Sequence, residues 1–136
     1  MLTLFILLCG FSFAGDEAPA WLKQAAATPP AIYPKEAKAV VLHKEQRITV
    51  EEDGRITETT FRAVRILTRE GRREAHAGVS YNTESGKVKE LKAWLIRPTG
   101  EVKVYGKQQT VEVAEVDNDI YNEHKIRLID ASDARA

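Results

Sequence analysis

The sequence predicts a mainly β fold, in which antiparallel hairpins form a β-sandwich-like domain after a signal peptide and a short N-terminal helix. Two observations carry this prediction. Asp53-Gly54 stands between two long β-rich runs, and Pro98-Thr99-Gly100 stands between two shorter ones. Turn residues flanked by such runs are a strong local signal for a β-hairpin. The length of 136 residues, with 43% apolar and 29% charged residues, suits one domain of this kind.

Residues 1–14 are predicted to be a signal peptide. They carry no charged side chain, and their apolar run is followed by Ser12 and Ala14 in the small-x-small arrangement of a signal-peptidase site. We therefore expect cleavage after Ala14 and a periplasmic or secreted protein. The run is shorter than the ~20 apolar residues of a membrane span, so no span is expected after cleavage. Cys9 leaves a lipoprotein signal open, although Leu8 is larger than the residue that normally precedes a lipidated cysteine.

Residues 15–38 are predicted to form a helix followed by a proline-rich lead-in. The segment from Asp16 to Ala27 favours a short helix with Pro19 in its first turn. Pro29 and Pro30 end this helix because proline cannot continue it. The lead-in then stays extended up to the first strand.

Residues 39–136 are assigned to the β domain, and its first hairpin is built around Asp53-Gly54. A two-residue turn there places Ile48 opposite Thr59, on a face shared with Val50 and Phe61. The charged residues of both strands then lie on the other face. Farther from the turn this register brings apolar residues onto the polar face, which indicates either burial on both sides or a β-bulge.

The second hairpin is centred on a three-residue loop with Gly100 in the left-handed conformation. This loop sets Trp94 opposite Val104 and Ile96 opposite Val102. Further strands are expected at 77–81, 88–95 and 125–129, with a turn at 83–86, although the spacing within 88–95 also fits a helix. Since no closing strand is found after residue 129, we expect an unpaired final sheet edge in a β domain truncated at its C-terminus.

Composition and motifs argue against several classes of function. The formal net charge is zero, whereas domains that bind nucleic acid usually carry a basic surplus. His43, His76 and His124 are too far apart in the chain to form a recognisable metal motif. Cysteine occurs once, at Cys9 inside the leader, so neither a disulfide nor a cysteine nucleophile is expected. We predict no catalytic residue, no metal and no cofactor.

Aromatic and basic residues provide the speculative ligand-binding set. Tyr81 and Trp94 suit a platform on which a sugar ring stacks, although aromatic residues in strands are more often part of the core. A basic stretch that contains Arg69, Arg72 and Arg73 suits an anionic ligand, although such runs are more often solvated or paired within the fold.

Several motifs, in their order along the chain, resemble a known family. They are the Ala20-Trp21 lead-in, the Asp-Gly hairpin followed by Arg65-Ile66-Leu67, the turn from Tyr81 to Ser85, and Ala93-Trp94 through Pro98-x-Gly100. Over residues 19–130 the chain resembles a bacterial domain of unknown function that precedes transglutaminase-like domains in exported proteins. The resemblance implies a β-sandwich-like module without catalytic residues, and it places the chemistry in a downstream papain-like domain with a Cys-His-Asp triad.

Three hypotheses of function arise from these observations. The favoured one is a non-catalytic accessory or scaffold domain that positions or regulates a transglutaminase-like domain downstream of this chain. The alternative is a periplasmic module that binds a glycan or a peptide through exposed aromatic and arginine side chains. An independent hydrolase is the third and least supported hypothesis.

Overall fold

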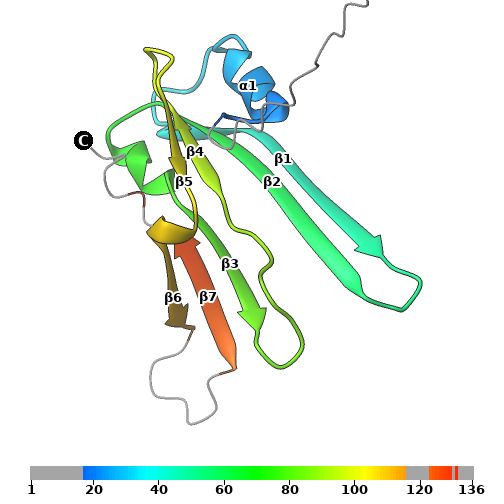
Figure 1. The fold of residues 1–136 in the computed structure, drawn as a ribbon. Coiled ribbons are helices and arrows are strands. Elements are labelled where there is room, and N and C mark those ends of the chain that lie inside the picture. Colours follow the sequence, from blue (N-terminus) through cyan, green and yellow to red (C-terminus); the bar gives the residue numbers. More distant parts are fainter. Residues whose placement is uncertain (1–16, 116–122, 130, 132–136) are drawn as a thin grey trace, which may run out of the picture.

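The computed structural model describes residues 17–115, 123–129 and 131. The predicted signal peptide, residues 1–14, lies outside the described residues. Within them the chain is mainly β, as predicted, with antiparallel sheets and one short α-helix (Figure 1). The elements, in chain order, are α1 (Ala20–Ala27), β1 (Ala39–Val50), β2 (Ile56–Ile66), η1 (Glu70–Glu74), β3 (Ala77–Asn82), β4 (Ala93–Ile96), β5 (Val102–Tyr105), η2 (Lys107–Gln109), β6 (Thr110–Ala114) and β7 (His124–Ile129).

Helix α1 begins one residue after Pro19, whose backbone is extended (ψ 154°) and which therefore caps the helix instead of lying in its first turn. Trp21 of α1 packs against the first hairpin. Its ring lies 5.4 Å from that of Phe61, edge to face, and 5.6 Å from the imidazole of His43. The helix is thus held in place by aromatic contacts with the base of the hairpin.

Strands β1 and β2 form a long hairpin, here called the arm, which extends away from the other strands (Figure 1). Its register corrects the prediction by one residue, since Ile48 lies opposite Glu58 and Val50 lies opposite Ile56. A slip of one residue moves side chains to the other face of the partner strand. Phe61 therefore lies on the face opposite to Ile48, where it meets Trp21.

The reason for the shift is the loop, which contains three residues instead of two. The amide of Gly54 donates to the carbonyl of Glu51 at 2.9 Å, and the amide of Glu51 donates to the carbonyl of Arg55 at 2.8 Å. Gly54 has φ +82°, so the loop is a tight turn followed by a left-handed glycine bulge. Asp53 reinforces it by accepting hydrogen bonds from both the amide and the guanidinium of Arg55.

A second irregularity in the arm confirms one of the two predicted alternatives. The pairing shifts between Val41 and His43, so that Val41 lies opposite Val64. This β-bulge resolves the clash of apolar and polar faces that a regular register would produce.

The hairpin of β4 and β5 confirms its predicted register. Trp94 lies opposite Val104 and Ile96 opposite Val102, across a loop in which Gly100 has φ +88°. The strand predicted at 88–95 is shorter than expected, since β4 begins only at Ala93. The turn at 83–86 is present, with the amide of Gly86 donating to the carbonyl of Asn82 at 2.9 Å.

The third sheet corrects the prediction of an unpaired final edge. Its strand order is β3-β7-β6, so the last strand, β7, is central and is paired on both sides. Among the strands that the structure describes, the edges of this sheet are β3 and β6. The edge of β7 is paired because the earlier strands β3 and β6 lie on either side of it, so no strand after residue 129 is needed to cover it.

The connection between β3 and β4 runs between the arm and the three-stranded sheet (Figure 1). The ammonium of Lys89 donates to the Thr57 hydroxyl of the arm at 3.1 Å, while the carbonyl of Val88 accepts from the Arg127 guanidinium of β7 at 3.2 Å. Residues 87–92 form no strand, and these bonds link them to both sheets. The face of the arm that carries Thr57 and the face of the three-stranded sheet that carries Arg127 both meet this connection. We call these two faces inner, and the opposite faces of the arm and of the three-stranded sheet outer.

Burial is sparse. Among the described residues, the buried apolar side chains are Ala18, Ala25, Ala63, Tyr105 and Ile129. Several large aliphatic side chains of the strands are exposed instead, and they lie mainly on the outer faces. The surfaces on which function can be sought are therefore sheet faces.

Candidate functional site

The outer face of the three-stranded sheet is apolar. Along β6 and β7, Val111 lies opposite Leu128, and Val113 lies opposite Ile126. Paired residues of adjacent strands point to the same side of a sheet, so these four side chains form one surface. Val111 is 51% exposed and Val113 is 45% exposed. We call these four residues the β6–β7 apolar patch.

Within the described residues, the patch borders a strand at the edge of its sheet. On the neighbouring strand β3, Gly78 pairs with Leu128, and a Cβ placed there would lie 2.6 Å from Leu128 Cδ2. The absence of a side chain at Gly78 thus lets Leu128 lie down over β3. On the other side, β6 is the edge strand of the sheet. An apolar face beside an unpaired edge is the usual form of a docking surface for another sheet or strand.

The inner face of the same sheet carries a cluster of charges centred on Glu112. Its carboxylate accepts hydrogen bonds from the Tyr81 hydroxyl at 2.5 Å, from Arg127 Nη2 at 2.8 Å and from Lys125 Nζ at 3.3 Å. These side chains come from all three strands. The bond from Tyr81, and next the one from Arg127, lower the pKa of Glu112 to about 2. The same bond to Glu112 raises the pKa of Tyr81.

This cluster fits a structural role better than proton transfer. A general acid or base works best with a pKa near the working pH, and the pKa of Glu112 is moved away from neutrality. Arg127, in turn, links the carboxylate to the connection at Val88. The cluster therefore ties three strands and the β3–β4 connection together.

A shallow groove lies at the base of the arm, between the outer face of β1–β2 and η1. It has a volume of about 390 Å³. Its floor is aliphatic, from Val41 and Val64, and its charged lining consists of three cations and three anions: Lys38, Arg62, Arg73, Glu36, Glu70 and Glu74. Arg62 pairs with Glu74 at 3.1 Å. The groove is therefore amphiphilic and balanced in charge.

Close packing positions η1 beside this groove. The amides of Leu67 and Thr68 both donate to the carbonyl of Lys38, at 2.9 and 3.1 Å. Gly71 lies directly on the same carbonyl, since a Cβ there would come within 1.9 Å of the oxygen. Glu70 is held ionised at the rim, because hydrogen bonds from its own amide and from the Thr68 hydroxyl lower its pKa.

The predicted ligand-binding residues fall in three places. Tyr81 belongs to the Glu112 cluster, with the Arg127 guanidinium 5.7 Å from its ring centre. Trp94 is half-buried in the other hairpin, with the Lys92 ammonium 5.4 Å from its ring centre. Among the residues that the structure describes, the buried Nε1 of Trp94 has no hydrogen-bond partner. The two aromatic side chains lie in different sheets, Tyr81 on β3 and Trp94 on β4.

The three arginines, by contrast, lie close together in the chain on η1. Arg69 precedes its first turn, Arg72 and Arg73 lie in its last turn, and Arg73 also lines the groove. Glu70 and Glu74 come from the same short helix, so the groove does not present the purely basic surface that an anionic ligand would need.

Sequence reasoning missed the β6–β7 apolar patch and the centre of the charged cluster. One signal was present for both. Residues 110–114 and 124–129 alternate, with valines flanking Glu112 and with Ile126 and Leu128 flanking Arg127. Alternation of this kind predicts two-faced strands, but only the pairing of β6 with β7 makes the two faces coincide.

The described residues show neither a cluster of metal ligands nor a helix suited to a membrane. Within residues 17–115, 123–129 and 131, no group of three or more His, Cys, Asp or Glu side chains is placed to hold a metal ion. The helices of these ranges lack the length and apolar character that crossing a bilayer requires.

Residues 52–136 match the family DUF3857, which is described as a domain of unknown function with a solved structure. The match spans more than half of the chain, which therefore belongs to this family. It begins in the loop of the arm, so β1 lies before the matched region. Neither the search of curated proteins nor the search of solved structures found a match.

Proposed function

We propose that this chain is the non-catalytic N-terminal accessory domain of an exported transglutaminase-like protein. In this role it positions or regulates a catalytic domain downstream of residue 136. The observation that carries the proposal is the β6–β7 apolar patch, an aliphatic face beside a strand that is at the edge of its sheet among the described residues. The link to a transglutaminase-like domain rests on the resemblance of the sequence motifs described above.

Docking at this patch is energetically reasonable. Complete burial of a valine or leucine side chain contributes about 1.5–3 kcal/mol, and the patch offers four partly exposed aliphatic side chains. Because β6 is an edge strand, its backbone can also pair with a strand from the partner. Such a contact would fix the orientation of the catalytic domain and restrict access to its cleft.

The proposal is tested first on the gene and then on the protein. The reading frame is expected to continue beyond Ala136 into a domain with Cys, His and Asp. Hydrogen exchange on the longer product, compared with the present chain, should then show added protection of the amides in 110–114. A stop codon directly after Ala136, or unchanged exchange in the longer product, would contradict the proposal.

Variants sharpen this test. Val113→Asp places a charge in the patch and should reduce the added protection at least tenfold, since a charge would have to be buried on docking. Val102→Asp is the matched control, because Val102 is also an exposed strand valine but lies in the β4–β5 hairpin. Equal effects of the two substitutions would show that the patch has no special role.

The predicted signal peptide has its own measurement. Intact mass and N-terminal sequencing of the protein recovered from a bacterial periplasm should give a chain that begins at Gly15. A chain that retains Met1 and stays in the cytoplasm would contradict the predicted export.

The groove at the base of the arm favours a second candidate function, the binding of a peptide. An aliphatic floor with cations and anions on the rim suits a peptide, which carries apolar side chains and both charges, better than an anionic glycan. Titration with short zwitterionic peptides, followed by NMR, should shift the amides of residues 70–74, and neutral oligosaccharides should not. Arg73→Ala should weaken the shifts, whereas Lys103→Ala, a change on β5, should not.

A further inference from the structure

In the described part of the chain, the outer face of the arm is exposed beyond its base. Ile48, Val50 and Ile56 are 62%, 67% and 68% exposed, and they lie together near the tip. Three aliphatic side chains on one face of a hairpin are a large apolar surface for a two-stranded ribbon, which is only marginally stable by itself in water. The inner face, by contrast, meets α1 and the ammonium of Lys89.

The register of the arm gives this outer face a definite order. From base to tip, its cross-strand pairs are Val41–Val64, Lys44–Arg62, Gln46–Thr60, Ile48–Glu58 and Val50–Ile56. Val41 lies five residues before Gln46, whereas Val64 lies four residues after Thr60. The β-bulge accommodates the extra residue and keeps Val41 opposite Val64, so that the pairs follow one another regularly along the face. The face is thus aliphatic at both ends, cationic on one side of the centre, anionic on the other, and polar at the centre.

This order is self-complementary. If a second copy is inverted end to end over the first, with a twofold axis at Gln46–Thr60, then each pair meets the pair at the same distance on the other side of the axis. Val50–Ile56 meets Val41–Val64 of the second copy, and Ile48–Glu58 meets Lys44–Arg62. Each contact occurs twice, as twofold symmetry requires. Glu58 then faces two cations, and the aliphatic tip covers the aliphatic floor of the groove.

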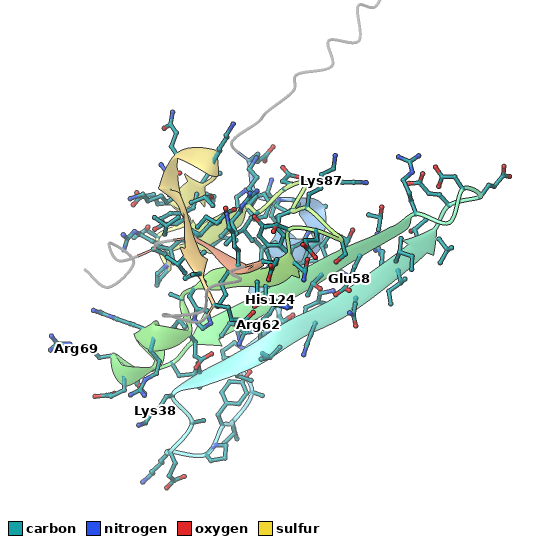
Figure 2. All side chains as sticks on the ribbon, turned by 90° about the horizontal axis from the view of Figure 1, so that it is seen from below. Lys38, Glu58, Arg62, Arg69, Lys87 and His124 are labelled. Carbon is teal, nitrogen blue, oxygen red and sulfur yellow. The ribbon has the colours of Figure 1, made fainter. Side chains whose placement is uncertain are left out.

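The distribution of charge supports the same arrangement. Figure 2 shows Lys38 at the base of the arm and then Arg62 and Glu58 along it, with Arg69 near the base. The tip carries Glu51, Glu52 and Asp53, and Arg55 pairs there with Glu51 and Asp53. Inversion therefore brings the tip of each copy to the groove of the other, where Lys38, Arg62 and Arg73 can meet its acidic side chains and where Val41 on the floor is 48% exposed.

We propose that two copies of this chain form a twofold dimer through the outer faces of their arms, in which the tip of each arm lies in the groove of the other. The packing of two sheets face to face, about 10 Å apart, accommodates this contact. The dimer is independent of the docking patch on β6 and β7, which lies on the other sheet. It would compete with a peptide for the groove.

The test is a charge exchange followed by sedimentation equilibrium on the full chain. Glu58→Lys places a cation opposite two cations, and the double variant Lys44→Glu with Arg62→Glu places two anions opposite Glu58. Each variant alone should raise the dissociation constant of the dimer at least tenfold. An equimolar mixture should restore dimers, because every contact then joins opposite charges.

Control variants should leave the dissociation constant of the dimer unchanged. Glu90→Lys and Lys87→Glu reverse exposed charges on the β3–β4 connection and should leave dimerisation unchanged. Circular dichroism verifies that each variant is folded. The proposal is overturned if the wild-type chain is a monomer up to about 1 mM, the weak limit of specific association. It is also overturned if a dimer forms that neither charge reversal weakens, or if the mixture does not recover. Val113→Asp should not affect the dimer. A failure of the dimer proposal can therefore be distinguished from a failure of the proposed docking function.

Discussion

The arm and the three-stranded sheet are held by different kinds of interaction. The strands of the arm are long, with twelve residues in β1 and eleven in β2, yet near the tip Ile48, Val50 and Ile56 are exposed. The strands of the sheet are short, but β7 is paired on both sides, and the Glu112 cluster joins all three strands. We therefore expect the stability of each region to depend less on strand length than on the number of partners that each strand has outside its own hairpin.

The largest difference in the free energy of unfolding is expected between alanine substitutions of two isoleucines. Ile129 of β7 is 3% exposed, whereas Ile48 of the arm is 62% exposed. Ile129→Ala should reduce the free energy of unfolding by about 3 kcal/mol, because it leaves a cavity, and Ile48→Ala should change it by less than about 0.5 kcal/mol. Denaturant unfolding at a concentration where the chain is monomeric measures both. Similar losses would show that the arm is packed more tightly than its exposure indicates.

The junction between the arm and η1 should be nearly as sensitive. Gly71→Ala forces a methyl group onto the carbonyl of Lys38, a backbone atom that cannot move aside, so we expect a loss of about 2–3 kcal/mol. Gly106→Ala is the control, because a Cβ at Gly106 meets nothing within 4 Å. Thermal unfolding of the two variants compares them. If Gly71→Ala were as stable as the control, the contact between η1 and Lys38 would not hold the groove.

The Glu112 cluster makes the sheet sensitive to acid. The pKa of Glu112 is lowered in the folded state to about 2, from an ordinary value of 4.5. The stabilisation is therefore fully present above about pH 4.5 and is lost as the pH falls toward 2. The wild-type chain should lose more stability over this window than Glu112→Gln, which cannot titrate. Equal pH profiles would show that Glu112 has no stabilising ion pair.

The smallest expected effect concerns the two left-handed glycines. Gly100→Ala should cost about 1 kcal/mol, because alanine is strained at φ +88°. Gly54 has φ +82°, but it lies at the tip of the arm, which can fray without global unfolding. Gly54→Ala should therefore lower global stability less, while it accelerates hydrogen exchange at Glu51. Unchanged exchange at Glu51 would show that the tip tolerates alanine.

Local sequence signals were sufficient where neighbours in the chain pair with each other. The hairpin of β4 and β5 was predicted with its register and its left-handed glycine, because Pro98-Thr99-Gly100 selects one turn geometry. For the arm, the turn was located correctly but was assigned one residue too few. Asp53-Gly54 suits both a two-residue turn and a three-residue loop with a glycine bulge, and the side-chain bonds between Asp53 and Arg55 accompany the longer form.

Nonlocal features required the tertiary structure. The sequence by itself determined that the chain is mainly β, where its turns lie and which strands alternate, since these properties depend on residues close together in the chain. Only the tertiary structure decided that β7 lies between β3 and β6, that Glu112 meets Tyr81 and Arg127, and that the outer faces carry exposed aliphatic side chains. Pairing between distant strands depends on the competition among all possible partners, which no local pattern contains.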